Sequence, residues 1–164
     1  FSSQIKTLGF VFIIIFFVFL GIFRSVSVSL IAIIPNITAA ILILGFIGLI
    51  NLPLDFMTIT VASITIGIAV DDTIHYMHRF QKEINITKDY QQAIINTHTS
   101  IGKAMYHTSL IIIAGFSILV LSNFNPSMYF GLLTGFAMFI ALACDLVLLP
   151  AVLKMFKPYK IQTR

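Results

Sequence analysis

Charged residues are scarce in this sequence: Asp, Glu, Lys and Arg together make up only 10% of its 164 residues. Hydrophobic residues make up 59%, and the mean hydropathy is +1.03. A soluble domain needs a polar surface to face water, so this composition excludes an ordinary soluble protein and favours one that is solvated by a lipid bilayer. At this length we expect one membrane domain.

Cysteine is almost absent, and Cys144 lies alone within an apolar run. This excludes an intrachain disulfide framework and a thiolate metal site. Glycine-rich phosphate loops, zinc signatures and nucleophile–base arrangements are also missing from the sequence, and His75 and His78 among nearby carboxylates are only a weak metal signal. We therefore expect no enzyme, no cofactor and no bound metal.

The apolar residues are arranged in five stretches, each long enough to cross roughly 30 Å of hydrocarbon as a helix. These stretches are 5–23, 26–50, 56–77, 104–121 and 128–149. Short segments with turn chemistry separate most of them, so neighbouring helices should be antiparallel. The sequence thus predicts an all-α membrane protein, a five-transmembrane-helix bundle over residues 1–157, followed by a basic tail at 158–164.

The one long connection, residues 79–103, mixes charges with side chains at helical spacing, namely Tyr90, Ile94, Thr97 and Ile101. With Thr87 as its N-cap, this pattern predicts an amphipathic linker helix along the cytoplasmic membrane surface. A loop helix packed on the bundle is the alternative.

Basic residues are distributed unequally between the two sides of the predicted bundle. Lys6 stands alone on one side, and the other nine are Arg24, Arg79, Lys82, Lys88, Lys103, Lys154, Lys157, Lys160 and Arg164. The positive-inside rule places the richer side, with the C-terminus, in the cytoplasm. The formal charge of +4 is therefore typical of membrane topology, and we expect no nucleic-acid partner. An odd number of spans also predicts that a further helix precedes this segment.

Three carboxylates lie within predicted spans, where an ionisable group costs about 2.5–3.5 kcal/mol and usually faces the bundle interior. They are Asp71 and Asp72 in the third span and Asp145 in the fifth. Because adjacent helical residues point about 100° apart, Asp71 and Asp72 should occupy neighbouring faces rather than form a dyad.

Each face continues along the helix. Asp71 aligns with His75 and His78, and Asp72 aligns with Tyr76. Desolvated carboxylates and histidines both titrate near neutral pH, so the pattern predicts a proton relay through Asp71, Asp72 and His75, with His78 and Tyr76 as second-tier polar groups. The alternative is that the two histidines only end the helix in interfacial water.

Other polar residues have simpler explanations. Arg79 extends the Asp72 face, and Asp145 pairs with a basic neighbour near the tail or joins the second-tier polar groups. His98, Lys103 and His107 mark the start of the fourth span, where snorkelling explains them.

Small residues recur at four-residue intervals, as at Gly131 and Gly135 and at Ser63 and Gly67 before Asp71. Such spacing is typical of close helix contact in lipid. We expect a neighbouring backbone to approach both faces.

The segment 67–75, Gly-Ile-Ala-Val-Asp-Asp-Thr-Ile-His, resembles the fourth transmembrane helix of the resistance-nodulation-division (RND) superfamily, in particular its MMPL-like lipid transporters. Segments 114–116, 130–134 and 145–151 are similar to that family's fifth and sixth helices, in the same order. The chain would then hold helices two to six of one half, a unit similar to a sterol-sensing domain.

This resemblance implies an exporter of lipids or other hydrophobic compounds, driven by protons that Asp71 and Asp72 carry, in the bacterial inner or plasma membrane. It implies as partners membrane lipids, protons, the missing helices and extracytoplasmic domain of a full-length transporter, and a second copy in a homo-oligomer. Two alternatives stay open: a sterol- or lipid-sensing module without transport, and a protein-translocation accessory of the same superfamily.

Overall fold

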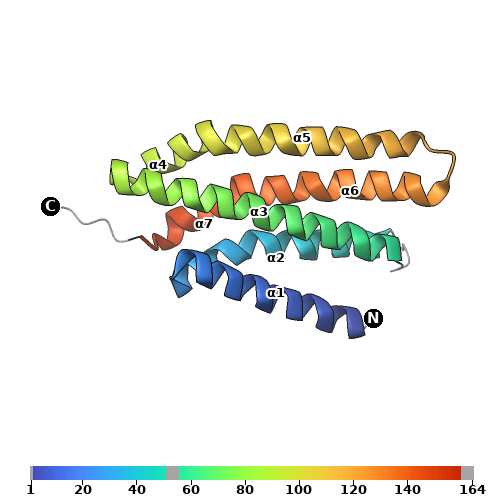
Figure 1. The fold of residues 1–164 in the computed structure, drawn as a ribbon, viewed down its shortest axis with the longest axis horizontal. Coiled ribbons are helices and arrows are strands. Elements are labelled where there is room, and N and C mark those ends of the chain that lie inside the picture. The colour runs from blue at the N-terminus through green and yellow to red at the C-terminus, as the bar shows by residue number, and fades with distance from the viewer. Residues whose placement is uncertain (1, 51–55, 160–164) are drawn as a thin grey trace.

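The computed structural model describes residues 2–50 and 56–159, and these residues form helices joined by short turns (Figure 1). The helices are α1 (Ser2–Phe23), α2 (Val26–Leu49), α3 (Phe56–Thr87), α4 (Tyr90–Thr97), α5 (Lys103–Ser117), α6 (Asn125–Ala143) and α7 (Leu149–Phe156). Two π-helical turns join helices without a break, η1 (His98–Gly102) between α4 and α5 and η3 (Cys144–Leu148) between α6 and α7. The 3₁₀ turn η2 (Ile118–Leu121) extends α5 at its end. The described chain is thus five helical rods, and the all-α prediction is confirmed.

Each predicted span overlaps one rod, but the spans 56–77, 104–121 and 128–149 are shorter than the rods 56–87, 90–121 and 125–156. Four rods are long and apolar enough to cross a membrane among the described residues: Lys6–Phe23, Val26–Leu49, Tyr90–Leu121 and Asn125–Phe156. The fifth, α3, is also long, with 32 residues, but its acids and histidines make it more polar. The predicted turn at 51–55 lies outside the described residues.

The predicted linker helix over 79–103 is not a separate element. Residues 79–87 extend α3, and residues 90–103 open the next rod. The break falls at Lys88, whose φ of 55° is left-handed, and Asp89 then caps α4 by accepting hydrogen bonds from the N–H groups of Gln91 (2.7 Å) and Gln92 (3.4 Å). Thr87 as the N-cap is wrong, because its hydroxyl donates back to the Glu83 carbonyl as in a helix interior.

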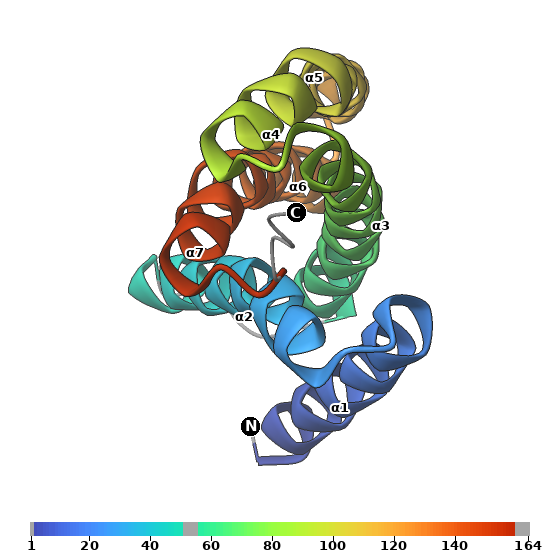
Figure 2. The same cartoon turned by 90° about the vertical axis from the view of Figure 1, so that its left-hand side faces the viewer.

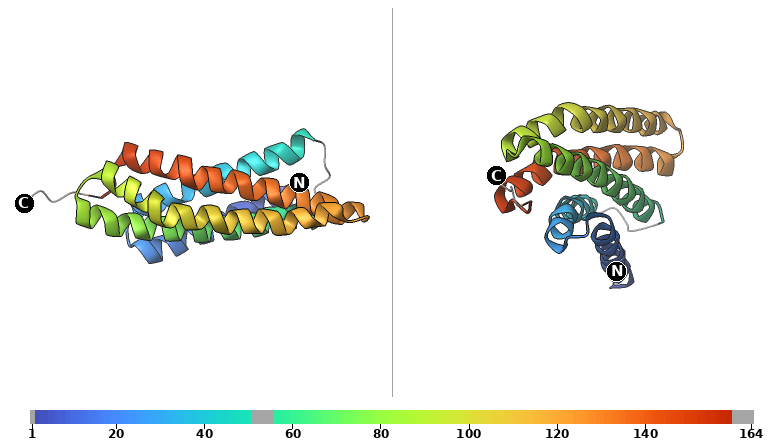
Figure 3. Two further views of the ribbon diagram at one scale, coloured as in Figure 1. Left: turned by 90° about the horizontal axis from the view of Figure 1, so that it is seen from above. Right: turned by 60° about the vertical axis from the view of Figure 1, so that its left-hand side comes forward.

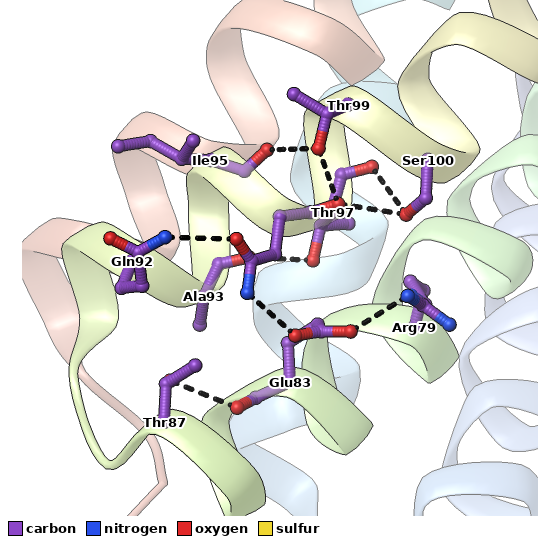
Figure 4. Close-up of polar contacts among 10 residues, drawn as sticks. Arg79, Glu83, Thr87, Gln92, Ala93, Ile95, Thr97, Thr99 and Ser100 are labelled. Atoms are coloured by element: carbon purple, nitrogen blue, oxygen red, sulfur yellow. Dashed lines mark hydrogen bonds and ion pairs between the residues drawn. The ribbon is translucent and has the colours of Figure 1, made fainter.

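The end of α3 (residues 79–87) and α4 form a helical hairpin, called the α3–α4 hairpin below. It packs on the bundle, as in the alternative that the sequence left open. Tyr90 and Thr97 are buried at the α3–α4 contact. On its polar side, Arg79 pairs with Glu83 at 2.8 Å, and the Asn96 amide donates to the other Glu83 oxygen at 2.9 Å. Figure 4 shows the Arg79–Glu83 pair on α3. Because the Arg79–Glu83 pair lies within α3, α4 is joined to α3 by the Asn96–Glu83 hydrogen bond and by apolar contacts.

The first residues of the predicted tail also pack. The Tyr90 hydroxyl donates to the Tyr159 carbonyl at 2.8 Å and accepts from the Tyr159 N–H at 2.7 Å. Burial, reinforced by nearby Tyr90, raises the pKa of Tyr159 well above its usual range. Residues 160–164 lie outside the described residues.

The helices α2, α3 and α6 contact one another at the centre, while α1 covers α2 and α5 covers α6 (Figures 2 and 3). Among the core residues are Phe19, Tyr76, Phe80 and Leu149. Large apolar side chains on α1 and α5 stay exposed, for example Phe17 and Ile111. Lipid chains suit such outer surfaces.

Basic residues end three helices at the same end of the bundle, where α1, α3 and α7 finish (Figure 1). Arg24, Lys88 and Lys157 each adopt left-handed backbone, with φ of 50°, 55° and 43°. Cations near helix C-termini are favourable because they offset the partial negative charge there. The N-terminus and the α5–α6 turn lie at the opposite end, so the structure separates the ends as the charge count predicted.

Candidate functional site

Asp71, the first residue of the predicted acidic pair, lies on the outer face of α3. The Asp71 carboxylate lies 3.6 Å from the Nε2 atom of His75, one turn further on, and the two side chains are 71% and 63% exposed. The two residues thus lie on one face of α3, as their spacing predicts. The general expectation that an acid within a span faces the bundle interior is wrong for Asp71 within this chain.

The exposed face of α3 extends in both directions from this pair. Ser63, Gly67 and His78 are exposed as well, and a Cβ atom built on Gly67 would meet nothing within 4 Å among the described atoms. The close backbone that we expected along Ser63 and Gly67 is not contributed by the described residues. The face is therefore open to a surface outside this bundle.

Asp72 lies on the neighbouring face and is partly buried. Its carboxylate interacts electrostatically with those of Asp71 and Asp145 and with His75. The divergence expected from the 100° step is confirmed. Asp72 is thus placed between the open face and the bundle interior.

Asp145 lies in the interior and is only 1% exposed. Its Oδ1 accepts a hydrogen bond from the Thr73 hydroxyl at 2.7 Å, and Thr73 Oγ1 in turn accepts from the Asn36 amide at 3.0 Å. The chain Asn36–Thr73–Asp145 therefore joins α2, α3 and η3. Pairing with a basic neighbour is wrong within the described residues, because the π-helical turn directs this carboxylate towards α3 instead of towards the tail.

Tyr76 also points inward. Its side chain is fully buried, and its hydroxyl lies 2.8 Å from Nδ1 of His98, whose Nε2 lies 2.9 Å from the Leu146 carbonyl. A carbonyl only accepts, so Nε2 carries a proton, and in the neutral ring Nδ1 accepts from Tyr76. The snorkelling explanation of His98 is wrong, because η1 turns its ring towards η3.

The two remaining predicted positions do not join the acids. Arg79 pairs with Glu83, and His78 lies exposed beyond the Asp71–His75 pair. Whether Asp71, Asp72 and His75 transfer protons stays a prediction, since the structure describes only where they lie.

Sequence reasoning did not include Asn36, Thr73 or His98 among the site residues. Asn36 carried a readable signal, since an amide within an otherwise apolar span needs a hydrogen-bond partner. Thr73 carried none beyond its place after the acidic pair. The partner of each was decided by how the helices are rotated against one another.

A hollow of about 410 Å³ lies elsewhere, between the start of α2 and the end of α7. Its lining is Ser27, Leu30, Ile31, Ile34, Phe156 and Pro158. None of the candidate site residues lines it.

Apolar rods packed around a helix that carries acids and histidines are typical of a polytopic membrane protein. The model of the MMPL family matches residues 1–160. The chain belongs to the MMPL family, and the resemblance to the RND superfamily is confirmed.

Three relatives illustrate the range of the match. A membrane protein of Methanocaldococcus jannaschii is 28% identical over 93% of this chain and 38% of its own length. The hopanoid transporter HpnN of Burkholderia multivorans is 25% identical over 95% of the chain and 17% of its own length. A Niemann-Pick type C1-related protein of Toxoplasma gondii is 27% identical over 77% of the chain and 12% of its own length. No solved structure matches, and the chain spans well under half the length of these relatives.

Proposed function

We propose that this chain is the membrane part of an RND-type exporter of lipids or other hydrophobic compounds, driven by the proton-motive force. In it, Asp71, Asp72 and His75 take part in proton coupling. The observation that carries the proposal is the open face of α3, where the Asp71–His75 contact of 3.6 Å adjoins the partly buried Asp72. Membership of the MMPL family and similarity to a hopanoid transporter support the cargo class.

The chemistry of the pair suits proton uptake and release. An imidazole can both donate and accept a proton, so His75 can pass a proton to the Asp71 carboxylate one turn away. Protonation removes the charge of Asp71, so the open face becomes able to pack against an apolar surface, while ionisation favours a polar one. Protonation and helix packing are coupled in this way.

The open face also implies a partner. A second helical unit, from the rest of a longer transporter or from another copy, would cover the Ser63–Gly67–Asp71 face, where small residues allow close approach. We place the basic end of the bundle and the C-terminus in the cytoplasm of a cell that carries the protein in its plasma membrane.

Replacing both acids in the full-length protein tests this function. The D71N and D72N variants, singly and together, should abolish proton-driven export of a lipid cargo from proteoliposomes while leaving protein insertion unchanged. D89N is the matched control, because the same chemical change falls on an exposed acid that caps α4, and asparagine also caps helices. Unchanged export by the double variant contradicts the proposal.

A lipid-sensing module is the second candidate, favoured by the similarity to a Niemann-Pick type C1-related protein. It predicts a conformational change that depends on lipid composition and is unaffected by a proton gradient. Measuring tryptic protection of the α3–α4 hairpin in liposomes, with and without a gradient, separates the two functions.

A further inference from the structure

The interior between α2, α3 and η3 contains two buried acceptor atoms without a hydrogen-bond donor. They are Oδ1 of Asn36 and Oδ2 of Asp145, and both belong to the same three-residue chain. Buried polar atoms are almost always paired, since an unpaired one costs about 1–3 kcal/mol. Two unpaired acceptor atoms in one hydrogen-bonded group indicate that a donor hydrogen is missing from this group.

The donors of this chain are all used. The Asn36 amide donates to the Ala32 carbonyl at 3.1 Å and to Thr73 at 3.0 Å, which fixes the orientation of the amide group. The single hydroxyl hydrogen of Thr73 goes to Asp145 at 2.7 Å. These three side chains therefore have no donor left for Oδ2 of Asp145.

The charges around Asp145 do not compensate an anion. The described groups that act on it are Thr73 and Asp72 from α3, the Cys144 thiol beside it on η3, and Asn36 from α2 through Thr73. Within the described ranges, Asp145 has no ion pair with a basic side chain. An ionised carboxylate here would be buried beside another acid, which is strongly unfavourable.

We propose that Asp145, Thr73 and Asn36 form a second, internal proton-binding site, in which Asp145 is protonated on Oδ2 at neutral pH. The proton turns Oδ2 of Asp145 from an unpaired acceptor into a donor. The side-chain carbonyl oxygen of Asn36 is the acceptor among these three residues that lacks a donor. Its role in coupling rests on the proton-driven transport proposed above, but the protonation itself does not.

A metal cation fits the same atoms poorly. Calcium takes six or more oxygen ligands, and magnesium requires near-octahedral coordination. Only two unpaired oxygens are present at this site. Among the described residues there is also no group of three or more His, Cys, Asp or Glu that could hold a metal. The proton is the occupant that needs no further ligand.

The hydrogen bonds from Asn36 to Thr73 and from Thr73 to Asp145 hold three rods together. Protonation of Oδ2 lets the buried carboxyl group stay in this position without a charge, whereas ionisation requires either entry of water or separation of η3 from α3. The neighbouring carbonyl of Leu146, also on η3, is held by His98 and through it by Tyr76. The site is thereby connected to the α4–α5 rod, so a change at Asp145 would reach the hairpin.

Infrared spectroscopy of the full-length protein in liposomes tests the proposal without a transport assay. At neutral pH we expect the carbonyl stretch of a protonated carboxylic acid, lost in D145N and retained in D89N and in the D71N/D72N double variant. Thr73→Val should keep this band and move it to higher frequency, because the hydrogen bond to Oδ1 is lost.

If D145N does not fold, the frequency shift of the carbonyl band in Thr73→Val still assigns this band to Asp145. Absence of an Asp145-dependent band at neutral pH, or its replacement by a carboxylate band on adding sodium ions alone, would overturn the proposal. Failure of the exporter function appears differently, as export by the D71N/D72N double variant with the Asp145 band intact.

Discussion

Gly131 offers the sharpest test of how the bundle is packed. It lies on α6 where this helix contacts α5 and η2, and a Cβ atom there would be 2.5 Å from the Phe116 carbonyl oxygen and 2.8 Å from Cβ of Leu119. Real Cβ contacts do not occur at such distances. One of the two atoms is backbone, so a flexible side chain cannot relieve the clash.

The expected cost of Gly131→Ala follows from these distances. Forcing an extra methyl group into a packed contact costs about 1–3 kcal/mol, while replacing glycine by alanine in a helix gains about 1 kcal/mol. Gly135 is the matched control one turn further on, since a Cβ there would have ordinary contacts of 3.8 Å to Ile113 and 4.0 Å to Ser117. Both variants gain the helix term and only Gly131→Ala meets the clash, so the two should differ in stability by about 1–3 kcal/mol.

The assay is the free energy of unfolding of each variant in mixed micelles, with helicity followed as the denaturing detergent is raised. Gly115→Ala adds a third reference, since no described atom lies within 4 Å of its Cβ position. If Gly131→Ala is as stable as Gly135→Ala, then α5 and α6 do not pack as described, and the reasoning is refuted.

The remaining predictions concern single contacts. Tyr76→Phe leaves Nδ1 of His98 without its donor and should lower stability by about 1–3 kcal/mol; a double-mutant cycle with His98→Ala should give a coupling energy of about 0.5–3 kcal/mol, and zero coupling would contradict the contact. Glu83→Gln removes the charge from the group that accepts from the Asn96 amide and should loosen the contact of α4 with α3, seen as faster amide exchange in α4, whereas unchanged exchange would count against it. Lys88→Gly should raise stability by about 1 kcal/mol because glycine tolerates the left-handed backbone at that position, and a loss of stability would show that the charge matters more.

Much of the polar site on α3 could be predicted from helix geometry alone. The separation of Asp71 from Asp72 and the contact of Asp71 with His75 depend only on the 100° step of one helix, which holds wherever that helix lies. The partners of Tyr76 and Asp145 depend on neighbouring helices. For these residues the sequence indicated the helix face on which they lie but not the residues of other helices that contact this face.

The two π-helical turns explain most of the wrong predictions about partners. Each adds a residue to one turn, so the positions that follow it are rotated relative to a regular helix. Asp145 and His98 both lie within such turns. An interpretation from their place along the chain, near the tail and at the start of the fourth span, does not take the π-helical turns into account.

The amino-acid sequence by itself determined the class of protein, the positions of the helical rods and the end at which the basic residues gather. These follow from the lengths of apolar runs and from the residues that interrupt them, which are properties of short segments. Only the tertiary structure decided that Asp71 faces outward and Asp145 inward, and that Asn36, Thr73 and His98 belong to the polar interior. The rotation of each rod about its own axis is set by side-chain packing between rods, and no single segment contains that information.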